Sequence, residues 1–147
     1  MGYIEAIAIS KKKGIRKSEI PAANVIQDWG IEGDAHAGKW HRQVSLLAGE
    51  SIDIVKEKMP NLPIGAFAEN IITRGIDFMS LEVGDRLTVA GHVILEITQI
   101  GKECHNSCAI KKITGDCIMP REGVFSKVIS GGKIQAGDPL DLELGVQ

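Results

Sequence analysis

The sequence lacks any long hydrophobic run, and no stretch approaches the roughly 18 apolar residues of a membrane-spanning helix. The segment Met1–Ile7 also lacks the basic and apolar regions of a secretory signal. Neither sign of charge dominates, since 17 lysines and arginines balance 19 aspartates and glutamates. Bulk charge therefore gives no argument for nucleic-acid binding. We expect a cytoplasmic protein that binds neither nucleic acid nor membranes.

Cysteine is scarce, and the three cysteines, Cys104, Cys108 and Cys117, lie in one short segment. An odd number in a cluster does not suit the disulfide framework of a secreted domain, so thiol or metal chemistry is the better interpretation. The sequence also has no Gly-x-Ser-x-Gly elbow, no His-Glu-x-x-His pair and no GxxxxGK[ST] phosphate loop. The chain therefore lacks the motifs by which serine hydrolases, zinc metalloproteases and nucleotide hydrolases are recognised.

The chain has enough apolar residues to form one hydrophobic core. Its 147 residues are 44% hydrophobic and 24% charged, which excludes the composition of a disordered chain. We predict a single domain over residues 1–147.

Short β-type runs dominate the pattern. In the first, Ile4, Ala6 and Ala8 are expected on one face of a strand. Strands are predicted over residues 3–10, 22–27, 44–47, 71–73, 86–90, 93–100, 124–130 and 140–144. Residues 29–41 carry three glycines without an apolar period and are predicted to be a loop.

One segment has the helical period. Ile52, Val55 and Met59 are spaced three and four residues apart before Pro60, which predicts a helix over residues 49–59. Many short strands with one clear helix favour a barrel-like β fold.

The sequence also predicts two kinds of turn. Ala90-Gly91-His92 separates two alternating runs and predicts a tight hairpin. Leu81–Leu87 echoes Ile134–Leu140, and in each the Gly-Asp pair supplies turn chemistry before a strand.

The glycine-rich loop 30–43 is the first candidate site. Its glycines allow close approach of a ligand, and its side chains offer donors to an anion such as phosphate. Those donors are His36, Lys39, His41 and Arg42. An ordinary surface loop is an equally good interpretation from the residues alone. A metal site at Asp34, His36 and His41 is a weaker alternative, because the histidine spacing is not diagnostic.

The second candidate follows the apolar run that ends at Ile100. Lys102 and His105 flank Cys104, and positive neighbours favour the thiolate, which attacks sulfur donors or binds soft metals. Cys108 lies one helical turn further on and is the alternative nucleophile. Burial of the cysteines as small hydrophobes, or a zinc site made by the three cysteines with His105, are the competing interpretations. In the short segment 65–70, Glu69 and Asn70 either bind a ligand or cap turns.

Several of these motifs, taken in order, resemble the MOSC family, which is named after the C-terminal domain of molybdenum cofactor sulfurases. The matching segments are Gly33–Gly38, Arg42–Leu47, Phe67–Asn70, Gly101–His105 and Val128–Asp138. The resemblance spans about residues 4–142. It implies a mainly β, MOSC-type barrel, similar to the β-barrel domain of pyruvate kinase, with one main helix and a few short helices. The chain is similar to a stand-alone bacterial member.

The resemblance also implies a function. Cys104, or alternatively Cys108, would carry sulfur as a persulfide, and Cys104 would ligate molybdenum when the molybdenum cofactor (molybdopterin) is bound. The residues expected to hold the cofactor are Asp34, His36, Lys39, His41, Arg42, Asn70 and Arg121, and Lys127 is a further cation for its phosphate. The expected partners are a sulfur donor such as a cysteine desulfurase, and cofactor-biosynthesis proteins or molybdoenzymes. No pyridoxal-phosphate lysine motif is recognised in the chain.

Three rival functions stay open. In these alternatives the chain would be a non-catalytic carrier of the cofactor, a zinc-binding protein, or a molybdenum-dependent reductase of N-hydroxylated compounds. The last is disfavoured by length, since such MOSC proteins carry an additional N-terminal domain.

Overall fold

The structure is a computed structural model that describes residues 2–13, 15–101 and 123–143. Within these ranges no helix is long and apolar enough to cross a membrane.

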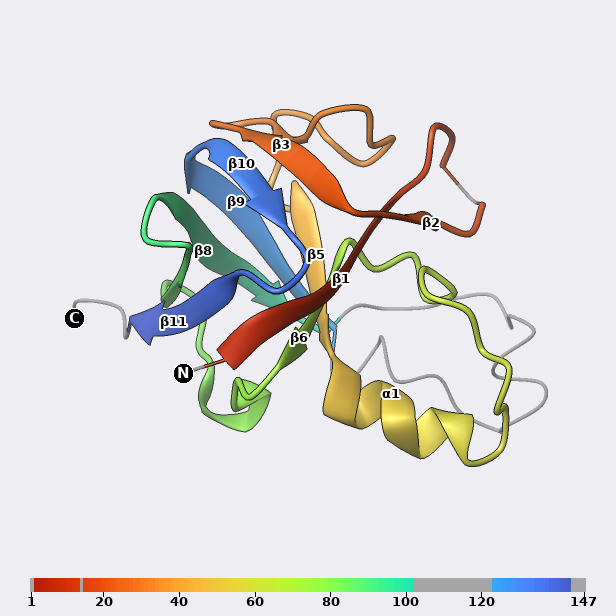
Figure 1. Ribbon diagram of the computed structural model, residues 1–147. Coiled ribbons are helices and arrows are strands. Elements are labelled where there is room, and N and C mark those ends of the chain that lie inside the picture. The colour runs from red at the N-terminus through yellow and green to blue at the C-terminus, as the bar shows by residue number, and fades with distance from the viewer. Residues whose placement is uncertain (1, 14, 102–122, 144–147) are drawn as a thin grey trace.

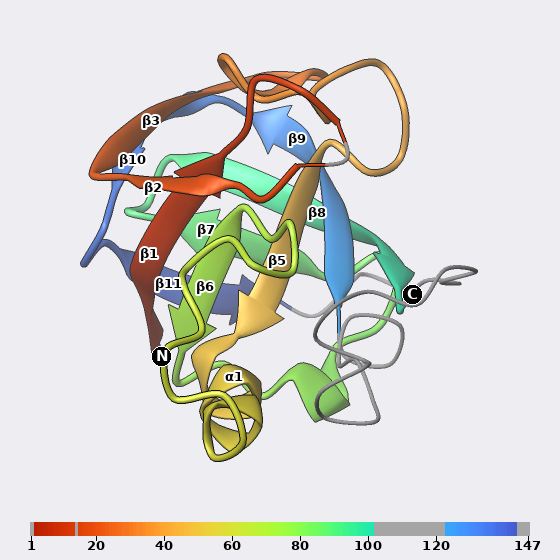
Figure 2. The ribbon, with the colours of Figure 1, turned by 90° about the vertical axis from the view of Figure 1, so that its right-hand side faces the viewer.

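Seven strands form a closed β-barrel (Figure 1, Figure 2). In order around the ring they are β11 (Pro139–Glu143), β7 (Arg86–Val89), β8 (Val93–Ile100), β9 (Val124–Ser130), β5 (Val44–Ala48), β6 (Ile71–Arg74) and β1 (Gly2–Ile9). The ring closes where β11 pairs with β1 through Gly2 opposite Leu140 and Tyr3 opposite Pro139. The predicted mainly β, barrel-type fold is confirmed.

One strand has three partners. β1 pairs with β11 at its start, with β6 in its middle and with the short strand β2 (Ser18–Ile20) at its end. A bulge between Ile4 and Ala6 shifts the register with β6. Because of this bulge, Ile4 packs in the barrel interior and Ala6 packs outside it. The expectation that these two residues share a face was therefore wrong, since a bulge breaks the two-residue alternation of side chains.

A second, three-stranded sheet packs against the barrel. Its order is β10 (Gly132–Gln135), β3 (Ala22–Ile26) and β4 (Gly30–Ile31). The sequence pattern predicted β3 but missed β2, β4 and β10. These three strands have three, two and four residues, too few to show an alternating pattern, and β4 lies inside the glycine-rich loop.

The described ranges contain one α-helix, α1 (Gly49–Lys56), and one 3-10 turn, Phe78–Ser80. The helix connects β5 to β6, which run parallel. It ends three residues before the predicted boundary, because the backbone N–H groups of Glu57 and Lys58 bond to carbonyls three residues back. Such bonds tighten the end of the helix into a turn before Pro60.

The barrel has two hydrophobic cores. The larger fills the interior with residues such as Ile7, Leu46, Ile71 and Leu95. The smaller lies outside the barrel wall, where α1 and the following loop cover residues such as Leu47 and Ile72. β5 is buried along its whole length because it contributes to both cores, which explains why its sequence is a continuous apolar run interrupted only by Ser45.

Both predicted turn motifs are confirmed. Ala90 and Gly91 adopt positive φ values of 52° and 78° in the hairpin between β7 and β8. In the two echoed motifs, the side chains of Asp85 and Asp138 each accept a hydrogen bond from the backbone N–H three residues earlier, at 2.9 and 2.8 Å. The repeat is therefore one turn used twice, before the neighbouring strands β7 and β11.

Candidate functional site

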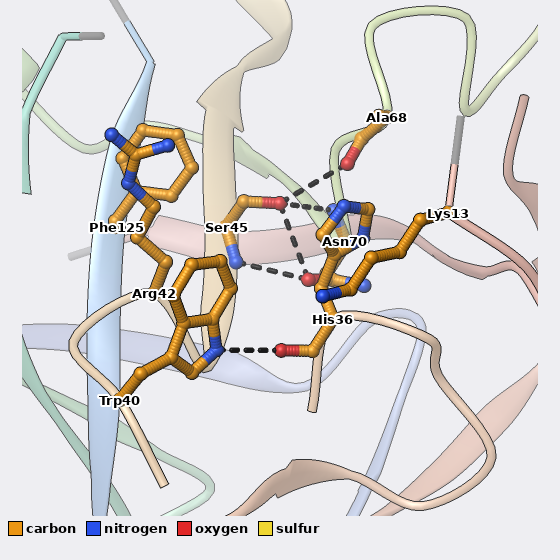
Figure 3. Close-up of a pocket in the computed structure, with 8 residues that line it drawn as sticks. All are labelled: Lys13, His36, Trp40, Arg42, Ser45, Ala68, Asn70 and Phe125. Carbon is orange, nitrogen blue, oxygen red and sulfur yellow. Dashed lines mark hydrogen bonds between the residues drawn. The ribbon is translucent and has the colours of Figure 1, made fainter. Parts of the chain in front are cut away.

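A pocket of about 180 Å³ opens beside the glycine-rich loop (Figure 3). Its lining residues are Lys13, His36, Trp40, Arg42, Ser45, Ala68, Asn70 and Phe125. Arg42 and Phe125 lie on one side, with His36 and Lys13 on the other. The lining residues are drawn from the loop after β1, from the loop before β5, from β5 and β9, and from the segment before β6.

Asn70 fixes the inner wall of this pocket. Its side-chain oxygen accepts hydrogen bonds from the backbone N–H and the hydroxyl of Ser45, at 3.0 and 3.2 Å. Its side-chain amide donates to the carbonyl oxygen of Ala8 at 3.1 Å. The Asn70 side chain therefore joins β5 to β1 just before β6 begins. Among the described residues the oxygen and one of the two amide hydrogens are thus engaged, so Asn70 shapes the pocket and keeps one N–H for a ligand.

Arg42 supplies a cation that is held in place but not neutralised. Its Nε donates to the side-chain oxygen of Gln99 at 3.1 Å, and its guanidinium lies 5.1 Å from the centre of the Phe125 ring. Among the described residues its two Nη nitrogens have no hydrogen-bond partner. Within the described part of the chain, the contacts with Gln99 and Phe125 leave the outer edge of the guanidinium available for an anion.

His36 is oriented by a buried ion pair. Lys17 Nζ lies 2.6 Å from Asp34 Oδ1, and both side chains are fully buried. The same Nζ lies 3.0 Å from His36 Nδ1. An ammonium group can only donate, so His36 Nδ1 is the acceptor, and the ring proton of a neutral imidazole is on Nε2. Asp34 further accepts hydrogen bonds from the backbone N–H groups of Ser10 and His36.

The Lys17 pKa is lowered from its usual value by burial, while the hydrogen bond and charge of Asp34 and the charge of Glu69 act in the opposite direction. Because Lys17 lies against a carboxylate at 2.6 Å, we assign it as the charged ammonium.

Trp40 connects the two sides of the pocket. Its indole N–H donates to the carbonyl oxygen of His36 at 2.8 Å, and Lys13 Nζ lies 5.5 Å from the centre of its ring. The lining thus holds two cations, Lys13 and Arg42, with His36, and none of the described lining residues is acidic. This combination favours an anion, and the aromatic surfaces of Trp40 and Phe125 suit a flat ring next to that anion.

The structure brings together three of the predicted binding residues, His36, Arg42 and Asn70. The other residues predicted in the loop are placed differently: Asp34 pairs with Lys17, His41 bonds through Nε2 to Gln99 at 2.9 Å, and Lys39 is exposed outside the lining. Lys127 pairs with Glu96 at 3.3 Å. The predicted residues Cys104, Cys108 and Arg121 lie outside the described residues.

Sequence reasoning missed Lys13, Lys17, Ser45, Trp40 and Phe125 as parts of the site. Trp40 sits inside the loop that was singled out, and its aromatic ring among cations was a usable signal. Lys17 gave none, because a single lysine after a basic turn predicts an exposed side chain. Within the described ranges no group of three or more His, Cys, Asp or Glu side chains is arranged so that it could hold a metal ion.

Glu69 lies next to this wall in sequence, yet its carboxyl is buried at 1% exposure. Burial raises the pKa of Glu69 to about 7, opposed by nearby backbone N–H groups and by the charge of Lys17. Its Oε1 accepts a hydrogen bond from the Phe67 N–H at 3.3 Å. Glu69 lines a different hollow from Asn70, as described below.

Fold and pocket together define a small β-barrel protein with a cation-lined pocket at one edge of the barrel. The sequence profile of the MOSC domain matches residues 33–141, which is more than half of the chain, so the chain belongs to the MOSC domain family. No curated protein sequence matches it.

Solved structures support the same assignment of fold. The YUAD protein of Bacillus subtilis superposes with a TM-score of 0.79 at 19% identity, over 100% of this chain and 98% of that one. YiiM of Geobacillus stearothermophilus superposes with a TM-score of 0.71 at 19% sequence identity, over 97% of this chain and 75% of that one. YiiM of Escherichia coli superposes with a TM-score of 0.66 at 18% sequence identity, over 99% of this chain and 71% of that one.

The buried ion pair yields a stability prediction. Lys17→Met leaves the Asp34 carboxylate buried without its partner, and we expect the free energy of unfolding to fall by about 3–5 kcal/mol. The double variant Lys17→Met/Asp34→Asn should lose less than the sum of the single losses, because it buries no uncompensated charge. Urea unfolding of the four proteins measures this coupling, with the exposed Lys12→Met as control. Additive losses would contradict it.

Glu69 yields a pH prediction. Its pKa is about 7 in the folded protein against 4.5 ordinarily, so the folded state binds the proton more tightly. This tighter proton binding contributes about 3 kcal/mol to the free energy of unfolding. The contribution is fully present below pH 4.5 and is lost as the pH rises to 7. Glu69→Gln stays neutral, so its stability relative to the parent should increase by that amount from pH 4.5 to 7.5. Urea unfolding across this range tests it, and a pH-independent difference would refute the shift.

Proposed function

We propose that this protein binds the molybdenum cofactor with the cofactor's phosphate in the cation-lined pocket, and that Cys104 carries sulfane sulfur as a persulfide beside it. The observation that carries the proposal is the pocket itself, in which Arg42, Lys13 and His36 face a common space and the described lining residues include no acid. Membership of the MOSC family supports the choice of cofactor.

The donor set fits a phosphate monoester. Guanidinium Nη groups suit two phosphate oxygens at once, an ammonium adds a point charge, and the Nε2–H of His36 adds a neutral donor. The volume also agrees with this assignment. At about 180 Å³ the pocket is smaller than the roughly 300–1,000 Å³ of typical small-molecule sites, so these residues form the phosphate end of a larger site. When bound, the molybdenum centre would supply a metal that accepts sulfur ligands.

The covalent chain supports a role for Cys104 near this pocket. Gln99, near the end of β8, touches both Arg42 and His41. Two residues later, the Gly101 N–H bonds to the carbonyl oxygen of Gly123 at 2.6 Å. Cys104 follows Gly101 by three residues, and an extended chain of that length spans at most about 11 Å. This short connection supports the proposal that Cys104 acts together with the Arg42 side of the pocket.

The sulfur step needs only a thiolate and a persulfide donor. The Cys104 thiolate attacks the outer sulfur of the donor's persulfide, R–S–SH. A new sulfur–sulfur bond forms on Cys104, the donor's sulfur–sulfur bond breaks, and the donor leaves as the thiolate R–S⁻. Lys102 and His105 would favour the attacking thiolate by their positive charge. A cysteine desulfurase is the class of partner that supplies such a donor.

A sulfur-adduct experiment tests the carrier role. The protein is purified without reductant after exposure to a cysteine desulfurase and cysteine, and its peptides are examined by mass spectrometry. We expect a mass increase of one sulfur atom on Cys104, absent in Cys104→Ser and retained in the matched variant Cys117→Ser. An adduct that persists in Cys104→Ser and disappears in Cys108→Ser moves the function to Cys108. If neither cysteine carries sulfur, the persulfide role is wrong.

A binding experiment tests the cofactor role separately. Arg42→Gln removes a charged donor worth about 1.5–3 kcal/mol, so retention of cofactor, measured by pterin fluorescence, should fall about tenfold or more. The exposed Arg16→Gln serves as control and should bind as the parent does. Equal binding by all three proteins would contradict the proposed phosphate pocket. Cofactor retention without any sulfur adduct identifies the non-catalytic carrier, and stoichiometric zinc identifies the zinc-binding alternative.

A further inference from the structure

A second hollow, of about 250 Å³, lies against α1. Its lining residues are Glu5, Ile52, Asp53, Lys56, Pro63, Ile64, Phe67, Glu69, Ile72 and Arg74. None of them lines the cation-lined pocket. The two hollows are therefore separate, although both use the segment Phe67–Asn70.

Part of the wall of this second hollow is apolar. Ile52 comes from α1, Ile72 from β6 and Phe67 from the loop between them, and all three belong to the smaller hydrophobic core. Ile64 packs against the same core. Such walls favour the hydrocarbon part of a ligand through the hydrophobic effect.

Glu69 places a strong acceptor next to these apolar side chains. Its Oε2 is buried and has no hydrogen-bond partner among the described residues. A buried acceptor without a partner costs about 1–3 kcal/mol. The preceding residue, Ala68, adds to this cost because it has a φ of 61°, in the left-handed region that alanine rarely adopts. The chain thus holds the carboxyl at an energetic cost, with Oε1 bonded to the Phe67 N–H and Oε2 left without a partner among the described residues.

The charges around the hollow disfavour anions. Arg74 donates from Nε to Glu5 at 2.9 Å and from Nη1 and Nη2 to the two oxygens of Asp53 at 2.6 and 3.0 Å. Its guanidinium is therefore occupied by two carboxylates. Lys56 is the other cation, so three carboxyl groups face two cations among the described lining residues. A ligand with positive charge, or with N–H donors, is favoured there.

We propose that this hollow is a second binding site, for a small molecule with an apolar body and one ammonium group that donates a hydrogen bond to Oε2 of Glu69. The apolar walls take the body, and the unpaired carboxylate oxygen takes the head group. An ammonium ion suits this position because it supplies donors only, and Oε2 of an ionised carboxyl is an acceptor only.

The binding should depend on pH through Glu69. The carboxyl has a pKa of about 7 in the free protein, and only its ionised form pairs with an ammonium. The affinity should therefore rise about tenfold for each pH unit well below 7 and level off above it. An uncharged alcohol of the same length should not show this rise.

n-Butylammonium is a suitable probe, with n-butanol and butyrate as matched compounds. NMR titration of the intact protein at several pH values between about 5.5 and 8.5 measures the affinity for each compound. We expect butylammonium to bind most tightly of the three above pH 7. Glu69→Gln should weaken its binding about tenfold or more at high pH and abolish the pH dependence. Glu19→Gln, the same change at an exposed carboxyl on β2, should leave binding unaltered.

Two further variants separate this site from the proposed cofactor pocket. Ile64→Phe fills part of the hollow and should weaken butylammonium binding, whereas Arg42→Gln should not affect it. Equal binding of butylammonium by the parent and Glu69→Gln would overturn the proposal, as would preference for butyrate or an absence of binding at high pH. Loss of binding in Arg42→Gln would also overturn it, because the ligand would then occupy the other pocket.

Discussion

The buried contact between Lys17 and Asp34 is the constraint on which the candidate site depends. Each charge loses several kcal/mol of hydration when it is buried, and only a short contact with further hydrogen bonds offsets that cost. The 2.6 Å ion pair, and the N–H groups of Ser10 and His36 that bond to Asp34, meet this requirement. They also tie the glycine-rich loop to the chain between β1 and β2. A loop with few apolar contacts thereby acquires one defined conformation, and His36 acquires a fixed ring orientation.

The segment before β6 applies a second constraint, because it serves both hollows. Phe67 and Glu69 line the apolar hollow, whereas Ala68 and Asn70 line the cation-lined pocket. The turn around Ala68 sends neighbouring side chains to different hollows, so four consecutive residues separate two environments of opposite preference. The positive φ of Ala68 and the hydrogen bonds of Asn70 to Ser45 and Ala8 hold the segment in this register.

Sequence patterns predicted what depends on local chemistry. The long strand β8 and the helix followed from apolar period, and the hairpin at Ala90-Gly91 followed from turn chemistry. His36 and Arg42 were found because they are donors in a glycine-rich loop. Lys17 was missed because its burial depends on Asp34, which is 17 residues away in sequence. The bulge in β1 and the burial of Glu69 are likewise products of tertiary packing, and no local pattern encodes them.

The two hollows are also linked electrostatically through Lys17. Its pKa is lowered by burial, and the charges of Asp34 and Glu69 both oppose that effect. Ionised Glu69 therefore helps to keep Lys17 in its ammonium form, and that form makes His36 Nδ1 an acceptor. Because Nδ1 accepts, the proton of the neutral ring lies on Nε2 as a donor. The charge of Glu69 thus acts on the pKa of Lys17, the residue that orients the His36 ring.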